Sequence, residues 1–178
     1  MNLMDYVSIV LSCGAYEAGT IGTKELIVHE EIRKICEENA CHNYGKTWAC
    51  PPAIGSLDEC RVRIENYGEM ILYSCKYPIE DSFDFQGMHQ SLLEFKGLSE
   101  RIQSRLIPVL SNGLFLSNEG CVRCKACSYP DAPCRFPEKL QHSIEGYGFI
   151  VSDLAKLAGI KYINEANTVT YFGGILLF

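Results

Sequence analysis

The chain has 178 residues, ten of which are Cys, and its formal net charge is −6. The hydrophobic content of 47% and the charged content of 21% are typical of a globular domain and exclude extended disorder. The acidic balance argues against general nucleic-acid binding, which needs a basic face. We expect one domain over residues 1–178, with enough core to fold without disulfides. The cysteines therefore need another explanation.

The sequence also argues against a membrane location. No apolar run reaches the roughly 18 residues that a membrane helix needs. Residues 10–13 resemble a lipid-attachment signal, but no Lys or Arg precedes them, and Asp5 lies where positive charge is required. We therefore expect a cytoplasmic protein. In that reducing compartment disulfides are rare, and clustered Cys indicate metal ligands or redox groups.

Hydrophobic periodicity predicts helices and strands separated by two irregular segments. In chain order we expect a short helix or strand at 5–12, a helix within 25–37, a helix at 56–68, a buried strand at 70–75, a long helix at 85–106, a strand at 113–117, a helix at 143–158 and a β-rich end at 168–178. Ser56 and Glu59 fit a capping box, while Gly68 and Gly159 fit helix ends. This order favours an α/β or α+β sandwich, in which helices cover a small sheet.

The two irregular segments, residues 36–55 and 119–142, carry most of the cysteines. Ordered loops of this length are uncommon inside a compact domain unless something holds them. The second segment contains three Cys at intervals of three residues and a fourth after them, at positions Cys121, Cys124, Cys127 and Cys134. Bacterial ferredoxins hold iron–sulfur clusters with a run of this kind, whereas zinc usually takes paired Cys or Cys with His. We therefore favour a [4Fe-4S] cluster here, with zinc as the alternative.

The first segment offers only three thiols, Cys36, Cys41 and Cys50. Another residue must complete this second metal site, or the metal keeps an open position at which substrate could bind. His42 and Cys60 are the nearest candidates in sequence. Alternatively the two segments exchange ligands, as two-cluster ferredoxins do.

Other residues near these thiols have different expected roles. Lys46, Trp48 and Arg135 flank the expected ligands, and could tune a bound cluster through charge, hydrogen bonds and solvent access. Cys13 and Cys75, like Cys60, fit ordinary positions in an apolar core. The Gly-Lys-Thr sequence at residues 45–47 is not a phosphate-binding loop, because position 40 is Ala and no helix follows.

The sequence resembles a bacterial and archaeal family of unknown function, described as predicted metal-binding, cysteine-rich proteins. The resemblance rests on residues across most of the chain: Cys36, Cys41, residues 44–52, Cys121, Cys124, Cys127, residues 133–138, residues 143–148 and residues 171–178. It implies metal binding and treats the first thiol triad as part of the shared pattern, but it implies no reaction. Gly146 departs from the pattern, in which we expect Ala.

Three functions are compatible with these observations. The first is an oxygen-sensitive iron–sulfur protein, with one or two clusters, that transfers electrons to a redox partner protein. The second is an enzyme that binds a small substrate at an open iron of the Cys36, Cys41 and Cys50 site, with Lys46 or His42 moving a proton. The third is a structural zinc module that binds another protein. The sequence leaves the oligomeric state open, and we expect neither nucleic-acid nor membrane binding.

Overall fold

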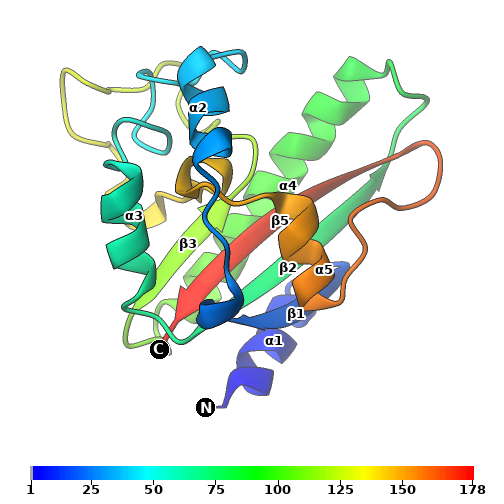
Figure 1. Cartoon of the computed structure of the whole chain (residues 1–178). Coiled ribbons are helices and arrows are strands. Elements are labelled where there is room, and N and C mark those ends of the chain that lie inside the picture. The colour runs from blue at the N-terminus through cyan, green and yellow to red at the C-terminus, as the bar shows by residue number, and fades with distance from the viewer. Residues whose placement is uncertain (1) are drawn as a thin grey trace.

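The computed structural model describes residues 2–178 and is built around one five-stranded sheet (Figure 1). The strand order is β1-β2-β5-β3-β4. The strands are β1 (Glu17–Gly22), β2 (Glu69–Pro78), β3 (Gly113–Ser117), β4 (His142–Ser143) and β5 (Thr168–Leu177). All neighbouring pairs are antiparallel except β3 and β4, which are parallel. The β-rich end predicted from the sequence is therefore the central strand.

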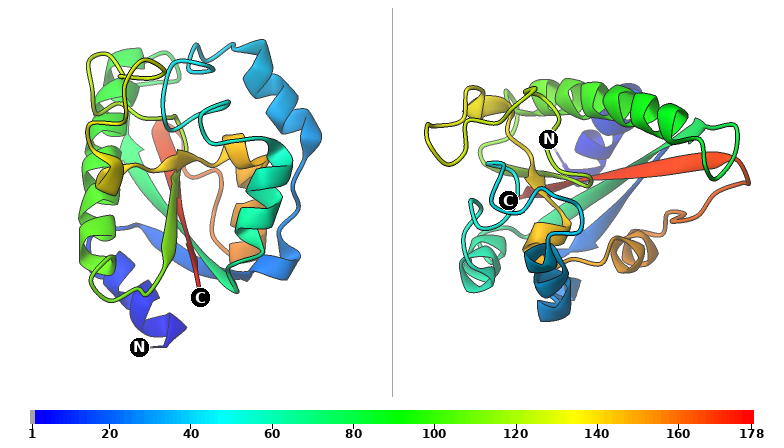
Figure 2. Two further views of the ribbon diagram at one scale, coloured as in Figure 1. Left: turned by 90° about the vertical axis from the view of Figure 1, so that its left-hand side faces the viewer. Right: turned by 90° about the horizontal axis from the view of Figure 1, so that it is seen from above.

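Within residues 2–178, five α-helices lie on the two sides of this sheet (Figure 2). Helices α1 (Leu3–Ser12) and α4 (Phe85–Leu106) pack on one face. Helices α2 (Glu30–Glu38), α3 (Leu57–Ile64) and α5 (Val151–Ala158) lie on the other. The expected arrangement, a small sheet covered by helices, is confirmed as a mixed α/β fold. Within residues 2–178, no helix is both long and apolar enough to cross a membrane.

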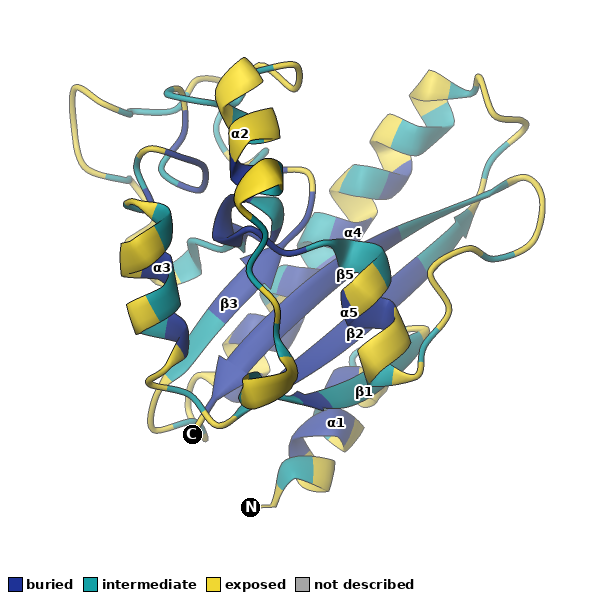
Figure 3. Cartoon of the chain, viewed as in Figure 1, coloured by how far each residue is buried: buried dark blue, intermediate teal, exposed yellow. Residues whose placement is uncertain are grey.

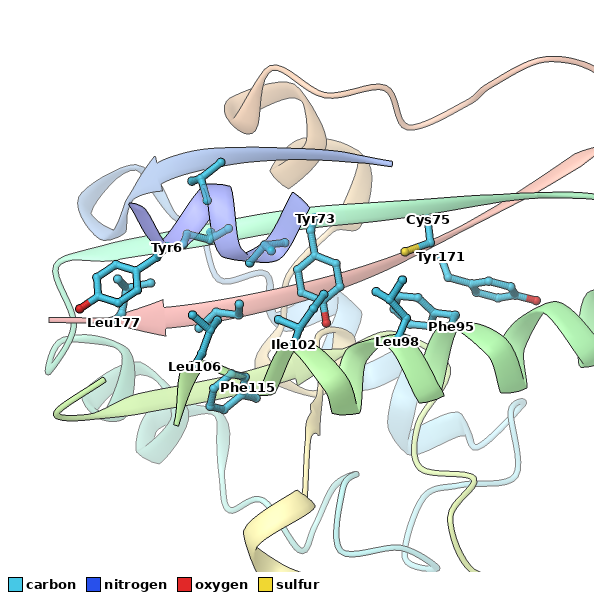
Figure 4. Packing of buried hydrophobic residues seen from close by; sticks show 14 residues of the cluster. Tyr6, Tyr73, Cys75, Phe95, Leu98, Ile102, Leu106, Phe115, Tyr171 and Leu177 are labelled. Carbon is cyan, nitrogen blue, oxygen red and sulfur yellow. The ribbon is translucent and has the colours of Figure 1, made fainter. Parts of the chain in front are cut away.

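The core under α1 and α4 combines five aromatic side chains with aliphatic ones (Figure 4). Tyr73 is buried in β2 and donates its hydroxyl to Ser99 Oγ of α4 at 2.9 Å. Its ring covers Gly173 on the neighbouring strand, where an added Cβ would lie 2.1 Å from Tyr73 Cζ. A second core fills the opposite face, and burial is concentrated on the sheet between the two cores (Figure 3).

Several predicted elements occur as expected. The long helix and the strand at 113–117 have the predicted bounds, and residues 5–12 belong to a helix rather than a strand. Ser56 Oγ accepts the Glu59 amide at 3.2 Å, and the Glu59 carboxylate accepts the Ser56 amide at 2.7 Å. The capping box at the start of α3 is therefore confirmed.

Other predictions were wrong. The expected helix at 143–158 is divided into β4, a 3-10 turn at Glu145–Tyr147 and α5, because Gly148 adopts a left-handed conformation with φ of 76°. Helix α3 ends at Ile64, four residues before Gly68, whose amide instead donates to the end of β5. Helix α2 continues through Cys36, so this thiol lies on a helix and not in the irregular segment expected from residue 36.

Candidate metal centre

The two cysteine-rich segments lie together at the end of the sheet where β3 finishes (Figure 1). Residues 39–55 and 118–136 contain no helix or strand. Trp48 joins them, because its indole Nε1 donates to the Ala132 carbonyl at 3.1 Å. The same ring meets Tyr129 edge to face, with 4.9 Å between the ring centroids. The first segment thus packs against the second through Trp48.

All four thiols of the second segment line a single cavity of about 30 Å³. Cys121, Cys124, Cys127 and Cys134 are each partly exposed. Arg135 lines the same cavity, and its guanidinium donates to the Ala126 carbonyl at 2.9 Å, across the turn that carries the Cys run. Cys134 is therefore grouped with the other thiols of its own segment, in agreement with the simpler of the two ligand assignments.

The three thiols of the first segment line a different cavity, of about 260 Å³. Cys36 comes from the last turn of α2, which ends because Asn39 adopts a left-handed conformation with φ of 59°. The Asn39 side chain then accepts the Tyr44 amide at 3.0 Å and fixes the turn that carries Cys41. Cys50 follows on the buried side of the loop.

Burial affects these thiols strongly. It raises the pKa of Cys36 to about 11 and also raises the pKa of Cys50, and nearby Glu145 and Cys41 act in the same direction. The buried site therefore disfavours thiolates unless a cation supplies compensating charge. Metal binding of this kind releases protons from the ligands.

The two thiol cavities meet along two stretches of backbone, where residues adjacent in sequence line different cavities. Ala49 lines the four-Cys cavity while the next residue, Cys50, lines the three-Cys cavity. In the second segment, Gly120 lines the three-Cys cavity and the next residue, Cys121, lines the four-Cys cavity. Gly120 permits this approach, because a Cβ there would lie 3.2 Å from Asn43 Nδ2, in a left-handed conformation with φ of 65°.

A layer of hydrogen bonds fixes the backbone behind the three-Cys cavity. The Ser143 amide of β4 donates to the Ala49 carbonyl at 2.8 Å. The buried guanidinium of Arg33 donates to the carbonyls of Gly55 and Gly146, so it ties α2 to the first segment and to the 3-10 turn. The position of this turn relative to the thiols is therefore set by tertiary contacts.

Two charged side chains that the sequence argument did not select lie beside the thiols. Glu145 lines the three-Cys cavity, and burial raises its pKa to about 7. Lys96 of α4 donates to Ser117 Oγ at 2.7 Å and to the Asn118 carbonyl, and burial lowers its pKa to about 8. The charges of Cys121 and Glu145, and of Cys50, favour the protonated form of Lys96, so this cation lies near a thiol of each set.

A larger cavity of about 740 Å³ lies next to the three-Cys cavity. Glu119 and Glu145 line both spaces. Asn164 lines the larger cavity, and its side-chain oxygen is buried without a hydrogen-bond partner among residues 2–178. Glu145 therefore lies between the three-Cys cavity and a larger cavity that could hold a small molecule.

A family comparison agrees with the chemistry of these donors. The model of the family "Predicted metal-binding protein (DUF2284)" matches residues 19–177. The chain belongs to this family. No curated protein and no solved structure matches it. The match confirms the resemblance inferred from the cysteine pattern and its metal-binding implication, and it identifies neither a metal nor a reaction.

The donors fit a metal in their chemistry, since thiolates are the soft ligands that bind zinc and iron–sulfur clusters. In the recorded arrangement, no three His, Cys, Asp or Glu side chains of residues 2–178 form a group that could hold a metal ion. Binding therefore requires the thiol side chains to turn toward the metal. A cavity of about 30 Å³ has room for one or two water molecules, so a four-iron cluster also requires the second loop to widen.

Several candidates from the sequence lie away from both thiol cavities. His42 and Lys46 are exposed and line neither cavity. Cys60 is buried in the core under α3, with its sulfur 3.8 Å from the Ile54 carbonyl. Cys13 and Cys75 belong to the core on the opposite face of the sheet. The structure thus groups seven thiols at the candidate centre and leaves these three in packed positions.

Gly146, the departure from the expected family pattern, has a steric explanation in this chain. A Cβ there would lie 2.3 Å from Ser143 Oγ and 2.6 Å from Ile54 Cδ1. Sequence reasoning missed its neighbour Glu145 because the segment had been assigned to a regular helix. The usable signal was the Gly-x-Gly spacing at Gly146 and Gly148, which disfavours a continuous helix.

Proposed function

We propose that this protein is an iron–sulfur electron-transfer protein with two adjacent metal centres. Cys121, Cys124, Cys127 and Cys134 would hold a [4Fe-4S] cluster, and Cys36, Cys41 and Cys50 would hold a second metal. The observation that carries the proposal is that each thiol set lines its own cavity, with consecutive residues of both loops facing the two cavities. Such a cluster supplies reversible one-electron chemistry at a potential set by its protein surroundings.

The surroundings of the four-Cys cavity suit this function. Its thiols are partly exposed, so a partner protein could approach within a short distance of the cluster. Trp48 and Arg135 line the cavity and would restrict water and add positive charge there. Lys96 adds a second cation near a thiol of each set. Positive charge near a cluster favours its reduced, more negative form.

The test is anaerobic purification followed by iron, sulfide and zinc analysis and a visible spectrum. We expect iron and acid-labile sulfide with a brown chromophore that dithionite bleaches. Cys124→Ser should remove most of this chromophore, whereas Cys13→Ser, a matched change at a core thiol, should leave it intact. A colourless protein with stoichiometric zinc would refute the proposal and favour the structural zinc module, which chelators should unfold.

A second candidate function is catalysis at the three-Cys centre. The observation that favours it is the shared wall of Glu119 and Glu145, which connects the thiols to a cavity of about 740 Å³. A metal there would act as a Lewis acid on a small substrate, while the four-Cys cluster would supply electrons. A change in the iron spectrum on adding small oxygen or sulfur donors supports this function. Unchanged spectra favour electron transfer alone.

A further inference from the structure

The three-Cys cavity needs a fourth ligand if it holds a tetrahedral metal. The structure places the earlier candidates elsewhere: His42 is exposed, Cys60 is packed in a core and Cys134 lines the other cavity. Of the residues that line the three-Cys cavity, two besides the thiols carry a metal-binding carboxylate, Glu119 and Glu145. The choice therefore lies between these two side chains.

Glu145 is the better placed of the two. It is partly buried and is held by a fixed backbone, since its neighbours Ile144 and Gly146 are buried and the Gly146 amide donates to Ser143 Oγ at 3.2 Å. Glu119 is exposed and lies in a loop. A ligand on a rigid element loses less conformational entropy when it binds than one on an exposed loop.

The carboxylate of Glu145 also lacks a cation of its own. Within residues 2–178, no ion pair joins Glu145 to a Lys, Arg or His, and the ammonium of Lys96 donates instead to Ser117 and Asn118. A carboxylate that is removed from water without a partner is unfavourable, and a bound cation would remove this cost. Three thiols and Glu145 line the same cavity, so a single metal could bind all four groups once their side chains turn toward it.

We propose that Glu145 is the fourth protein ligand of the metal held by Cys36, Cys41 and Cys50. This inference rests on the proposed function only in that the first-segment thiols bind metal. A carboxylate oxygen is a harder ligand than a thiolate, so it is the position at which the metal exchanges ligands most readily. Because Glu145 also lines the larger cavity, that exchange would admit a small oxygen or sulfur donor from this cavity.

The test uses Co²⁺ as a spectroscopic probe of the first site alone. The full-length chain is prepared with Cys121, Cys124, Cys127 and Cys134 changed to Ser, and Co²⁺ is titrated anaerobically into the reduced protein. We expect one Co²⁺ per chain, with cobalt–thiolate charge-transfer bands and tetrahedral ligand-field bands. Glu145→Gln should weaken binding by at least about tenfold and shift the ligand-field bands, since even loss of a hydrogen bond to a ligand costs about 10–100-fold.

Two further variants decide the result. Glu119→Gln, a matched change at the other carboxylate, should bind Co²⁺ like the parent protein. Glu145→Cys should restore tight binding, with the stronger charge transfer of four thiolates. If Glu145→Gln leaves affinity and spectrum unchanged, or if Glu119→Gln produces the loss, the assignment of Glu145 is overturned.

A separate measurement distinguishes this failure from failure of the proposed function. In the chain that keeps all its cysteines, the iron and sulfide of the four-Cys centre are analysed for Glu145→Gln and for the parent. An intact four-Cys cluster, combined with a first site that binds Co²⁺ but ignores Glu145, overturns the ligand assignment alone. A first site that binds no Co²⁺ overturns the ligand assignment and also the second metal centre of the proposed function. If neither chain contains iron and sulfide, the electron-transfer proposal fails, while the Co²⁺ titration still decides the role of Glu145.

Discussion

Gly146 gives the sharpest test of how the fold supports the candidate centre. In Gly146→Ala the new methyl group would lie 2.3 Å from Ser143 Oγ, 2.6 Å from Ile54 Cδ1 and 3.1 Å from Pro51 Cδ. These contacts are too close, so Ser143 must rotate and give up the hydrogen bond that it accepts from the Gly146 amide, and Ile54 must shift within the core. Overpacking of this kind costs about 1–3 kcal/mol.

We therefore expect Gly146→Ala to lower the free energy of unfolding by about 2 kcal/mol, which for a chain of this size lowers Tm by about 4–8 °C. The control is Gly97→Ala in α4, where the nearest atom to a new Cβ is Arg101 Nη1 at 3.8 Å. There the change fills open space in a helix and should raise the free energy of unfolding by about 0.5–1 kcal/mol.

The assay is urea unfolding of the reduced, metal-free protein, followed by far-ultraviolet circular dichroism for both variants and the parent. Both substitutions add one methyl group. Opposite changes in the free energy of unfolding would therefore reflect the different packing around the two glycines. Equal stability of Gly146→Ala and the parent would refute the steric reasoning. The same variant moves the backbone next to Glu145, so it should also weaken Co²⁺ binding at the first site.

Three further predictions address other contacts. Tyr73→Phe leaves the buried Ser99 hydroxyl without its partner and should lower the free energy of unfolding by about 1–2 kcal/mol. Urea unfolding measures this change, and an unchanged urea midpoint would contradict it. Trp48→Phe keeps an aromatic ring but loses the 3.1 Å hydrogen bond to the Ala132 carbonyl. A chelator should therefore remove metal from the second segment about fivefold faster than from the parent protein. Equal release rates would show that this hydrogen bond does not hold the loop. Burial, assisted by Arg63, lowers the pKa of His142 to about 4, so the folded state binds fewer protons than the unfolded state as pH falls from about 6.5 to 4. The contribution of neutral His142 to the free energy of unfolding is full above pH 6.5, and about 2 kcal/mol of it should be lost by pH 5 in the metal-free protein. His142→Asn should not show this loss. Parallel curves of unfolding free energy against pH for the two proteins would contradict the lowered pKa of His142.

The sequence was a good guide where local signals and tertiary packing agree. The apolar period of α4 and the capping box of α3 act within one turn or one face of a helix, so they could be recognised without the fold. The 3-10 turn at Glu145–Tyr147 could not, because it is held by Arg33 of α2, which is more than a hundred residues away in sequence. Cys36 was assigned to an irregular segment, but α2 continues through it to Glu38.

The sequence by itself determined that this chain folds as a mixed α/β protein and carries two separate groups of thiols in irregular segments, because residue spacing and composition are local properties. Only the tertiary structure decided that the two groups line cavities with adjacent wall residues, that Cys134 faces its own segment and that His42 and Lys46 face solvent. It also brought Glu145 to the three thiols, across about a hundred residues of chain. These outcomes depend on how β3, β4 and β5 pair and on the contacts of Arg33 and Trp48, which no short stretch of sequence encodes.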